Sequence, residues 1–339
     1  MRSLICRKIS EDITSVEIEE IELPEPEPNE VQIKIMACAV NFPDILMIQG
    51  KYQFKPPLPF APGGEFSGEI VAIGSQVSGF STGDRVVAGA RYGGFSEYIN
   101  VDENSVRTLP KAISFAKAAC YSTTYLTALV ALKIRGNLQP NETLLVHGAT
   151  GGVGLAAVDL GKYMGAKVIA TGGTDEKLAI VKARGADHII NYTQQDASLG
   201  GFKEKVKELT NGRGADVIFD PVGGTVFDES IRCINWNGRI LTIGFTSGVW
   251  PKAPVNHILI KQISVIGVRA GEIGRRNPEL GRQNGAEIHQ LLTEGSIDPH
   301  VCASFPIEDA VKAMQMLQNR KVVGKVVITA NGYSPQEIT

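Results

Sequence analysis

The first 120 residues contain short apolar runs that alternate with polar turns. Four of these runs are VQIKIMACAV, GEFSGEIVAIG, DRVVAGA and SEYINV, and the segments around them, LPEPEPNE, KPPLPFAPGG and GFSTGD, are rich in proline and glycine. Short apolar runs bounded by turn-forming residues are typical of β-strands. The pattern predicts an antiparallel or barrel-like β domain.

The pattern changes from about residue 123, where strand-like and helix-like runs alternate. TLLVHGA leads through glycines into VGLAAVDLGKYMGA, whose apolar positions recur at helical spacing, and then into KVIATGG. The alternation continues through DEKLAIVKARGA, DHIINY, FKEKVKELTNGRGA, DVIFDPVGG, VFDESIRCIN, GRILTIG and ISVIGV. It predicts an α/β fold with a doubly wound parallel sheet.

After Val268 a polar stretch precedes two predicted helices, near GRQNGAEIHQLLTEG and IEDAVKAMQMLQNR, and a closing strand, GKVVITA. We expect this end of the chain to return to the β domain. The predicted organisation is a first domain over residues 1–122, a cofactor domain over 123–268, and a final segment, 269–339, that adds a helix to the cofactor domain and then returns.

Composition narrows the function classes. The 34 basic and 36 acidic residues among 339 give a formal net charge of −2, so nucleic acid is a poor partner. The N-terminus lacks the apolar core of a signal peptide, and no run approaches the ~20 apolar residues of a membrane helix, so we expect a cytoplasmic protein. The five cysteines are scattered, which favours free thiols over a disulfide framework or zinc site.

A glycine-rich turn joins the first predicted strand of the cofactor domain to its first helix. It consists of Ala149, Thr150, Gly151, Gly152, Val153 and Gly154. Small residues let the backbone approach a pyrophosphate, and the amide groups and dipole of the new helix stabilise its charge. The fingerprint departs from the usual pattern, because Ala149 stands at its first position. A glycine-rich turn needed only for steric reasons is the alternative.

The end of the next predicted strand distinguishes NADP from NAD. It ends in Gly172, Gly173 and Thr174, without the carboxylate that would bind a ribose 2′-hydroxyl, although Asp175 and Glu176 follow. The space beside glycine suits a 2′-phosphate, and Lys177 and Tyr192 are placed to contact it. A solvated helix lysine and a core-covering tyrosine are the alternatives. Together these features favour NADPH.

Seven stretches of the chain resemble one family. They are AVNFPDILMIQGKY (39–52), PGGEFSGEIVAIG (62–74), GDRV (83–86), GGFSEY (93–98), YLTAL (125–129), DPVGG (220–224) and GKVVI (324–328). With the central glycine turn they are similar to the quinone oxidoreductase branch of the medium-chain dehydrogenase/reductase superfamily. The resemblance implies a GroES-like β-barrel-type catalytic domain and a Rossmann cofactor domain.

The resemblance also bears on metal. Zinc-containing members place cysteine, histidine and a further cysteine or carboxylate where this chain has Asn41, Gly64 and Thr123. These three residues cannot supply the donors of a catalytic zinc site, and the cysteine-rich loop of a structural zinc is missing, so we expect no metal.

The resemblance implies catalytic roles for three residues: Asn41 and Tyr52 line the cleft beside the nicotinamide, and Asp44 orders the same loop. Asn41 and Tyr52 can donate hydrogen bonds. The alternatives are an asparagine that holds a turn before Pro43 and a tyrosine that packs beneath KPPLPF. Glu65 and Asp84 are interpreted as loop-organising carboxylates.

Further cofactor contacts follow from the same resemblance. Thr127 would face the cofactor carboxamide, the backbone near Gly244 and Phe245 would contact the nicotinamide side, and Arg320 would add a cation at the 2′-phosphate. A threonine bonded to its own helix backbone and an exposed arginine at a helix C-terminus are the alternatives.

Without a Lewis acid, the chemistry that these features favour is hydride transfer from NADPH to a quinone or an α,β-unsaturated carbonyl compound. An enoyl-CoA-type reductase remains an alternative, with Arg269, Arg275 and Arg276 as candidate phosphate contacts. So does a protein that binds NADPH with little turnover. Relatives pair through the edge strands of their cofactor domains, here 263–268, so we expect a homodimer.

Overall fold

The structure, a computed structural model, describes residues 1–336. The chain divides into two compact units, each described below by itself. Unit 1 comprises Met1–Ser122 and Asp298–Thr339, and unit 2 comprises Thr123–Ile297. Within residues 1–336, no helix has the length and apolarity that crossing a membrane requires.

Unit 1 is built on a strongly bent, largely antiparallel sheet with the order β14-β15-β3-β4-β5-β7, in which β6 also pairs with β3. Only the pair β14–β15 is parallel. The strands are β3 (Glu30–Ala39), β4 (Glu65–Ile73), β5 (Arg85–Gly89), β6 (Tyr98–Asp102), β7 (Val106–Thr108), β14 (Val301–Pro306) and β15 (Lys325–Thr329). β1 (Arg2–Ile5) and β2 (Glu17–Glu20) form a separate antiparallel ribbon.

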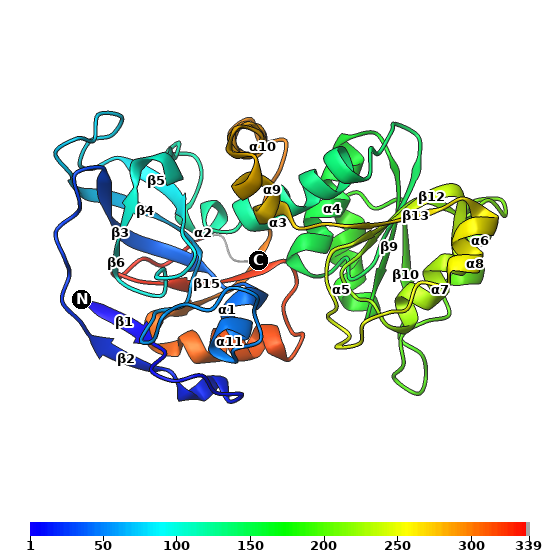
Figure 1. The fold of residues 1–339 in the computed structure, drawn as a ribbon, viewed down its shortest axis with the longest axis horizontal. Coiled ribbons are helices and arrows are strands. Elements are labelled where there is room, and N and C mark those ends of the chain that lie inside the picture. The colour runs from blue at the N-terminus through cyan, green and yellow to red at the C-terminus, as the bar shows by residue number, and fades with distance from the viewer. Residues whose placement is uncertain (337–339) are drawn as a thin grey trace. The chain divides into compact units, whose positions relative to one another are not determined.

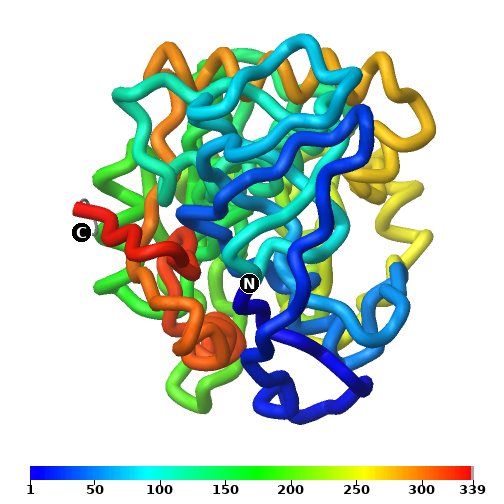
Figure 2. Tube along the Cα trace, turned by 90° about the vertical axis from the view of Figure 1, so that its left-hand side faces the viewer, coloured from blue at the N-terminus to red at the C-terminus, as the bar shows by residue number. Residues whose placement is uncertain are grey.

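The central strand of unit 1 is β3, and seven of its ten residues are buried. Val31, Ile33 and Ile35 lie in the hydrophobic core together with Met314 of α11 (Ala310–Gln318). Figure 2 shows α11 beside the N-terminal segment, so the two ends of the chain share this core. The remaining helices are α1 (Phe42–Ile48), α2 (Phe115–Ala118) and the 3₁₀ turns η1 (Ile13–Ser15), η2 (Glu103–Ser105) and η4 (Ile307–Asp309).

Unit 2 contains a six-stranded sheet in the order β10-β9-β8-β11-β12-β13, with every pair parallel. Its strands are β8 (Thr143–Val146), β9 (Lys167–Gly172), β10 (His188–Asn191), β11 (Ala215–Asp220), β12 (Ile234–Thr242) and β13 (Ser264–Gly267). The strand order reverses between β8 and β11, as in dinucleotide-binding folds. The predicted doubly wound parallel sheet is confirmed.

Helices cover both faces of this sheet (Figure 1). α4 (Gly152–Tyr163) and α5 (Asp175–Ala183) lie on one face, and α6 (Lys203–Leu209), α7 (Thr225–Cys233) and α8 (Val255–Lys261) on the other. The unit also contains α3 (Ser122–Leu129), the π-helical segment η3 (Val130–Arg135), α9 (Ala270–Arg276) and α10 (Pro278–Thr293). The sheet therefore has two buried faces, which explains the continuous apolar runs of its strands.

The polar stretch after Val268 contains a helix, α9, that the apolar pattern did not predict. Glu272 in its first turn forms ion pairs with Arg275 at 3.0 Å and with Arg276 at 2.9 Å, at helical spacings. Arg269 approaches the same carboxylate at 3.7 Å. Charge pairs of this kind stabilise a helix without an apolar stripe, so the usual periodicity is absent.

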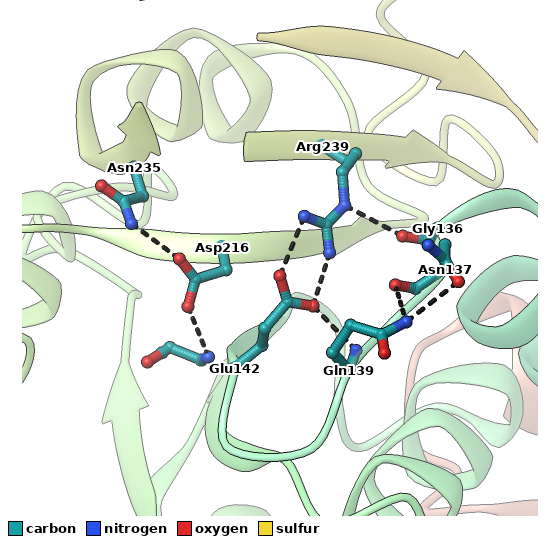
Figure 3. Close-up of polar contacts among 8 residues, drawn as sticks. Gly136, Asn137, Gln139, Glu142, Asp216, Asn235 and Arg239 are labelled. Atoms are coloured by element: carbon teal, nitrogen blue, oxygen red, sulfur yellow. Dashed lines mark hydrogen bonds and ion pairs between the residues drawn. The ribbon is translucent and has the colours of Figure 1, made fainter. Parts of the chain in front are cut away.

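A polar network joins strands β8, β11 and β12 at the amino-terminal edge of the unit 2 sheet (Figure 3). The Arg239 guanidinium donates to both carboxylate oxygens of Glu142, at 3.0 and 2.5 Å, and its Nε donates to the carbonyl of Gly136 at 2.9 Å. Beside it, Asp216 accepts hydrogen bonds from the Thr143 amide and from Asn235, each at 2.7 Å. These contacts fix the loop that leads into β8.

Replacing Arg239 with methionine should lower the free energy of unfolding by about 1–2 kcal/mol, because Glu142 loses a bidentate partner in a site where both side chains are only about one-fifth exposed. Urea denaturation measures the loss. As a matched control, Lys133→Met breaks the more exposed Lys133–Glu287 pair and should cost about 0.5 kcal/mol or less. Equal losses in the two variants would contradict this interpretation.

Candidate functional site

The glycine turn connects β8 to α4, which begins at Gly152 with Gly151 as its N-cap. The first hydrogen bond of the helix runs from the Leu155 amide to the Gly151 carbonyl at 2.8 Å. The amide groups of residues 152–154 precede it and are not committed to the helix ladder. The first turn contains no acidic side chain. This arrangement can bind an anion with backbone amides and the positive end of the helix dipole.

Gly154 allows a close approach between the helix and the end of β8. A Cβ atom at this position would lie 2.2 Å from the Gly148 carbonyl oxygen and 2.8 Å from the Ala149 Cα, so any other residue would push α4 away from the turn. Ala149 itself is fully buried, and its amide donates to the Thr171 carbonyl of β9. The residues present therefore fit a pyrophosphate cradle, even with alanine at the first fingerprint position.

The loop after β11 lies at the same carboxyl edge of the parallel sheet. Asp220 accepts hydrogen bonds at Oδ1 from the amides of Val222 and Gly223, at 2.8 and 2.9 Å, and burial raises the pKa of this carboxyl. Its Oδ2 is buried and has no hydrogen-bond partner among residues 1–336. The Thr246 amide donates to the Pro221 carbonyl, so the loop after β12 contacts the loop after β11.

Gly244 and Phe245 open that second loop, directly after β12. The Phe245 ring is 41% exposed, and it lies 6.4 Å from the ring of Trp250. A Cβ atom at Gly223 would lie 3.0 Å from the Phe245 ring, so the loops after β11 and β12 are in close contact. The structure thus brings the predicted backbone segment to the same sheet edge as the glycine turn.

His147 supports this edge from within the core. It is fully buried between β8, β9 and α7, with Nδ1 2.8 Å from Thr171 Oγ1 and Nε2 2.8 Å from Ser230 Oγ. The Ser230 hydroxyl donates to the Val226 carbonyl, so Nε2 of His147 must carry the proton and donate to Ser230. Burial lowers the pKa of His147 to about 3, which keeps the ring neutral.

The residues expected at a 2′-phosphate differ in burial and in the free space around them. A Cβ atom at Gly172 would lie 2.9 Å from Leu178 and 3.0 Å from Thr150, so a larger residue would be crowded at this position. Gly173 has more room, since the nearest atom is Thr193 Oγ1 at 3.6 Å. Lys177 is half-buried in the first turn of α5.

Thr174 is the N-cap of α5, and its hydroxyl accepts a hydrogen bond from the Lys177 amide at 3.4 Å. Asp175, which follows it, accepts a hydrogen bond from Asn191 at 3.1 Å. Tyr192 is 5% exposed and belongs to the unit 2 core, with its ring 6.4 Å from that of His147. The role of Tyr192 at a 2′-phosphate stays a prediction.

Two other residues were expected to contact the cofactor. Thr127 in α3 donates its hydroxyl to the Thr123 carbonyl at 2.7 Å, which is the backbone hydrogen bond of the alternative interpretation. Arg320 belongs to unit 1, where it follows the end of α11 in a left-handed conformation with an exposed side chain. The cofactor roles of both residues stay predictions.

In unit 1, Asp44 organises the loop between β3 and α1. One oxygen accepts the Asn41 amide at 2.7 Å and the other the Gly63 amide at 3.1 Å. The side chain is 2% exposed. Burial raises the pKa of Asp44 to about 6, although the two amide hydrogen bonds and the charge of Lys325 oppose the shift. Asp44 therefore holds the start of α1, where Asn41 is the N-cap residue.

The Asn41 side chain instead contacts two buried charged groups. Its Nδ2 donates to Glu65 Oε2 at 3.1 Å, and its Oδ1 accepts from Lys325 Nζ at 2.5 Å. Glu65 is fully buried and also accepts from Ser122 at 3.0 Å, while Lys325 is 6% exposed. Asn41 itself is half-buried.

Tyr52 is half-buried and packs against the hydrophobic core of unit 1. Its hydroxyl has no hydrogen-bond partner among residues 1–336. Asp84 accepts the Ser81 amide at 2.8 Å, as a loop-organising carboxylate does. A Cβ atom at Gly64 would lie 2.9 Å from the Ala90 carbonyl oxygen, so that position has no room for a side chain. In residues 1–336, no three His, Cys, Asp or Glu side chains gather as metal donors.

Sequence reasoning did not assign Lys325 or His147 to the site. Lys325 lies in the quoted motif GKVVI, but its residue type at the start of a strand gives no sign of burial. His147 lies directly between the strand run TLLV and Gly148. Only this position could have suggested that His147 belongs to the site.

Comparisons with known proteins agree with this architecture. The family model "Alcohol dehydrogenase GroES-like domain" matches residues 27–111, and "Zinc-binding dehydrogenase" matches residues 152–282. A "Quinone oxidoreductase-like protein 2 homolog" of Nematostella vectensis is 42% identical over 88% of this chain and 81% of its own length.

Two solved structures are similar over nearly the whole chain. The quinone oxidoreductase of Escherichia coli complexed with NADPH is 29% identical with a TM-score of 0.86, covering 97% of this chain and 100% of its own. The enoyl reductase CurK is 28% identical with a TM-score of 0.85, covering 97% and 99%. Unit 1 thus contains the predicted GroES-like domain and unit 2 the predicted Rossmann-type domain. The chain belongs to the quinone oxidoreductase-like branch of the medium-chain dehydrogenase/reductase superfamily.

Proposed function

We propose that this protein is a zinc-independent oxidoreductase that uses NADPH to reduce a quinone or an α,β-unsaturated carbonyl compound. The observation that carries the proposal is the Asn41 side chain, which stands where zinc-containing relatives have a cysteine and is bonded to Glu65 and Lys325. An amide in this position offers a hydrogen-bond donor in place of a Lewis acid. Electron-poor acceptors need only such a donor near the oxygen where charge develops.

Unit 2 supplies the groups that would hold the cofactor. The backbone of residues 149–154 would bind the pyrophosphate, the loop at Gly244 and Phe245 would contact the nicotinamide side, and Lys177 and Tyr192 would bind the 2′-phosphate. Bound NADPH supplies a hydride from its nicotinamide ring. The E. coli relative solved with NADPH supports this choice of cofactor.

Unit 1 supplies the groups that would bind the acceptor. Asn41 would donate a hydrogen bond to the acceptor oxygen, and Asp44 would keep the loop of Asn41 in place through the amides of Asn41 and Gly63. One donor to a developing oxyanion contributes about 100- to 1000-fold to the rate in other enzymes. Water or Tyr52 would supply the proton that the acceptor needs after it has received the hydride.

The proposal is tested with the purified protein, NADPH and three acceptors: a simple para-quinone, a linear enone and a short enoyl thioester. We expect NADPH oxidation with the quinone or the enone, unchanged after treatment with a strong chelator. Activity confined to the enoyl thioester would favour a dedicated enoyl reductase. Tight NADPH binding without oxidation of any acceptor would refute the reductase function.

Cofactor preference provides a second test. Lys177→Ala should weaken NADPH binding by about tenfold and leave NADH binding unchanged, because only NADPH has the 2′-phosphate that a lysine would contact. Isothermal titration measures both affinities. Lys182→Ala is the matched control, since Lys182 lies in the same helix and donates to the Asp187 carbonyl. Equal losses for both cofactors in Lys177→Ala would refute the assigned role.

We also propose that two copies of the chain associate through the β13 edge of unit 2. β13 is the last strand of the sheet, and Val265 within it is 37% exposed. Val255, Leu259 and Ile260 of the neighbouring α8 are 77%, 78% and 72% exposed. Apolar side chains gathered at an open strand edge are typical of surfaces that a partner covers. A second copy is the partner that the family resemblance implies.

Sedimentation analysis should give twice the 36.4 kDa chain mass for the unmodified protein. Leu259→Glu should shift the protein to monomer, because a charge would have to be buried in the interface. Tyr163→Glu replaces a side chain that is 57% exposed on α4, on the other face of the sheet, and should leave the mass unchanged. A dimer that persists in Leu259→Glu would contradict the proposed interface.

A further inference from the structure

The orientation of the Asn41 amide is determined by its two partners. Lys325 has only donors to offer and the Glu65 carboxylate only acceptors. A flipped amide would place Nδ2 against the ammonium group and Oδ1 against the carboxylate, so both contacts would become repulsive. The observed arrangement, with Oδ1 toward Lys325 and Nδ2 toward Glu65, is therefore the only one that satisfies both.

This orientation leaves one N–H donor of the Asn41 amide available. Oδ1 accepts from Lys325, and one N–H of Nδ2 donates to Glu65. The second N–H has no partner among residues 1–336. Since Asn41 is half-buried while Glu65 and Lys325 are buried, this N–H is a donor that a ligand can use.

Lys325 is held in place by contacts on three sides. Its Nζ donates to the Val40 carbonyl at 3.2 Å as well as to Asn41, and it lies 3.8 Å from Glu65 Oε2. The two side chains of the ion pair are 7% and 0% exposed. Each buried charge compensates the other, and Asn41 bridges them.

We propose that Lys325 is a positioning residue which, together with Glu65, locks the Asn41 amide as a hydrogen-bond donor toward the acceptor oxygen of the substrate. The role rests on the proposed reductase function. It favours a carbonyl or quinone oxygen, on which negative charge grows during reduction.

A double-mutant cycle on quinone reduction tests whether Lys325 acts through Asn41. We expect kcat/KM to fall about 100-fold in Asn41→Ala and about tenfold in Lys325→Met. The double variant should be no slower than Asn41→Ala, because without the amide there is nothing left to position. Multiplied losses of about 1000-fold would overturn the proposal.

Two further variants separate positioning from lost stability. Lys325→Met leaves Glu65 without its cation, so Lys325→Met/Glu65→Gln removes both charges and should fold more stably than Lys325→Met alone. It should still be at least about fivefold slower than the unmodified protein, since Asn41 Oδ1 has no lysine. Arg239→Met, which weakens contacts with Gly136 and Glu142 within unit 2, should keep kcat/KM unchanged in the folded protein. Full recovery of kcat/KM in Lys325→Met/Glu65→Gln would refute a role for Lys325.

The orientation itself is measurable without turnover. In ¹⁵N-asparagine-labelled protein, the Asn41 side-chain signal is identified by its absence in Asn41→Ala. Its two protons should exchange with water at rates that differ by about tenfold or more, because only one is bonded to Glu65. In Lys325→Met the two rates should converge. Equal rates in the unmodified protein would overturn the proposal even if no acceptor were reduced, which keeps this failure distinct from failure of the reductase function.

Discussion

The buried ion pair between Glu65 and Lys325 is the constraint on which unit 1 depends. A fully buried carboxylate is costly unless a cation compensates it, and here the cation comes from the first residue of the last strand. Asn41, which joins the pair, is 284 residues from Lys325 in the sequence. The buried carboxylate in the first segment of unit 1 is thus compensated by a lysine in its second segment. Unit 2 lies between these two segments in the sequence.

Much of the architecture followed from periodicity, because the strands of unit 2 are buried on both faces and its helices have apolar stripes. Where other forces stabilise an element, periodicity failed. α9 is stabilised by ion pairs on Glu272, and α1 starts where Asp44 binds two backbone amides. Such contacts involve charged residues, and a hydropathy pattern assigns charged residues to the solvent-exposed surface.

The candidate site was predictable where backbone geometry determines the residue type. Gly154 has to be glycine because any Cβ would meet the Gly148 carbonyl oxygen. The surroundings of Gly172 could not be judged from sequence, since Leu178 and Thr150 approach it only in the folded chain. The sequence did not identify Lys325 as a site residue for the same reason. A lysine at the start of a strand is usually solvated, and its burial depends on tertiary contacts.

The discontinuity of unit 1 has a consequence for biosynthesis. A ribosome releases the whole of unit 2 before it releases β15, so the parallel sheet can fold while the antiparallel sheet still lacks a strand beside β3. Until then Glu65 lacks the ion pair with Lys325. On the nascent chain, the proposed nucleotide cradle can therefore form before the amide of Asn41 acquires its proposed fixed direction.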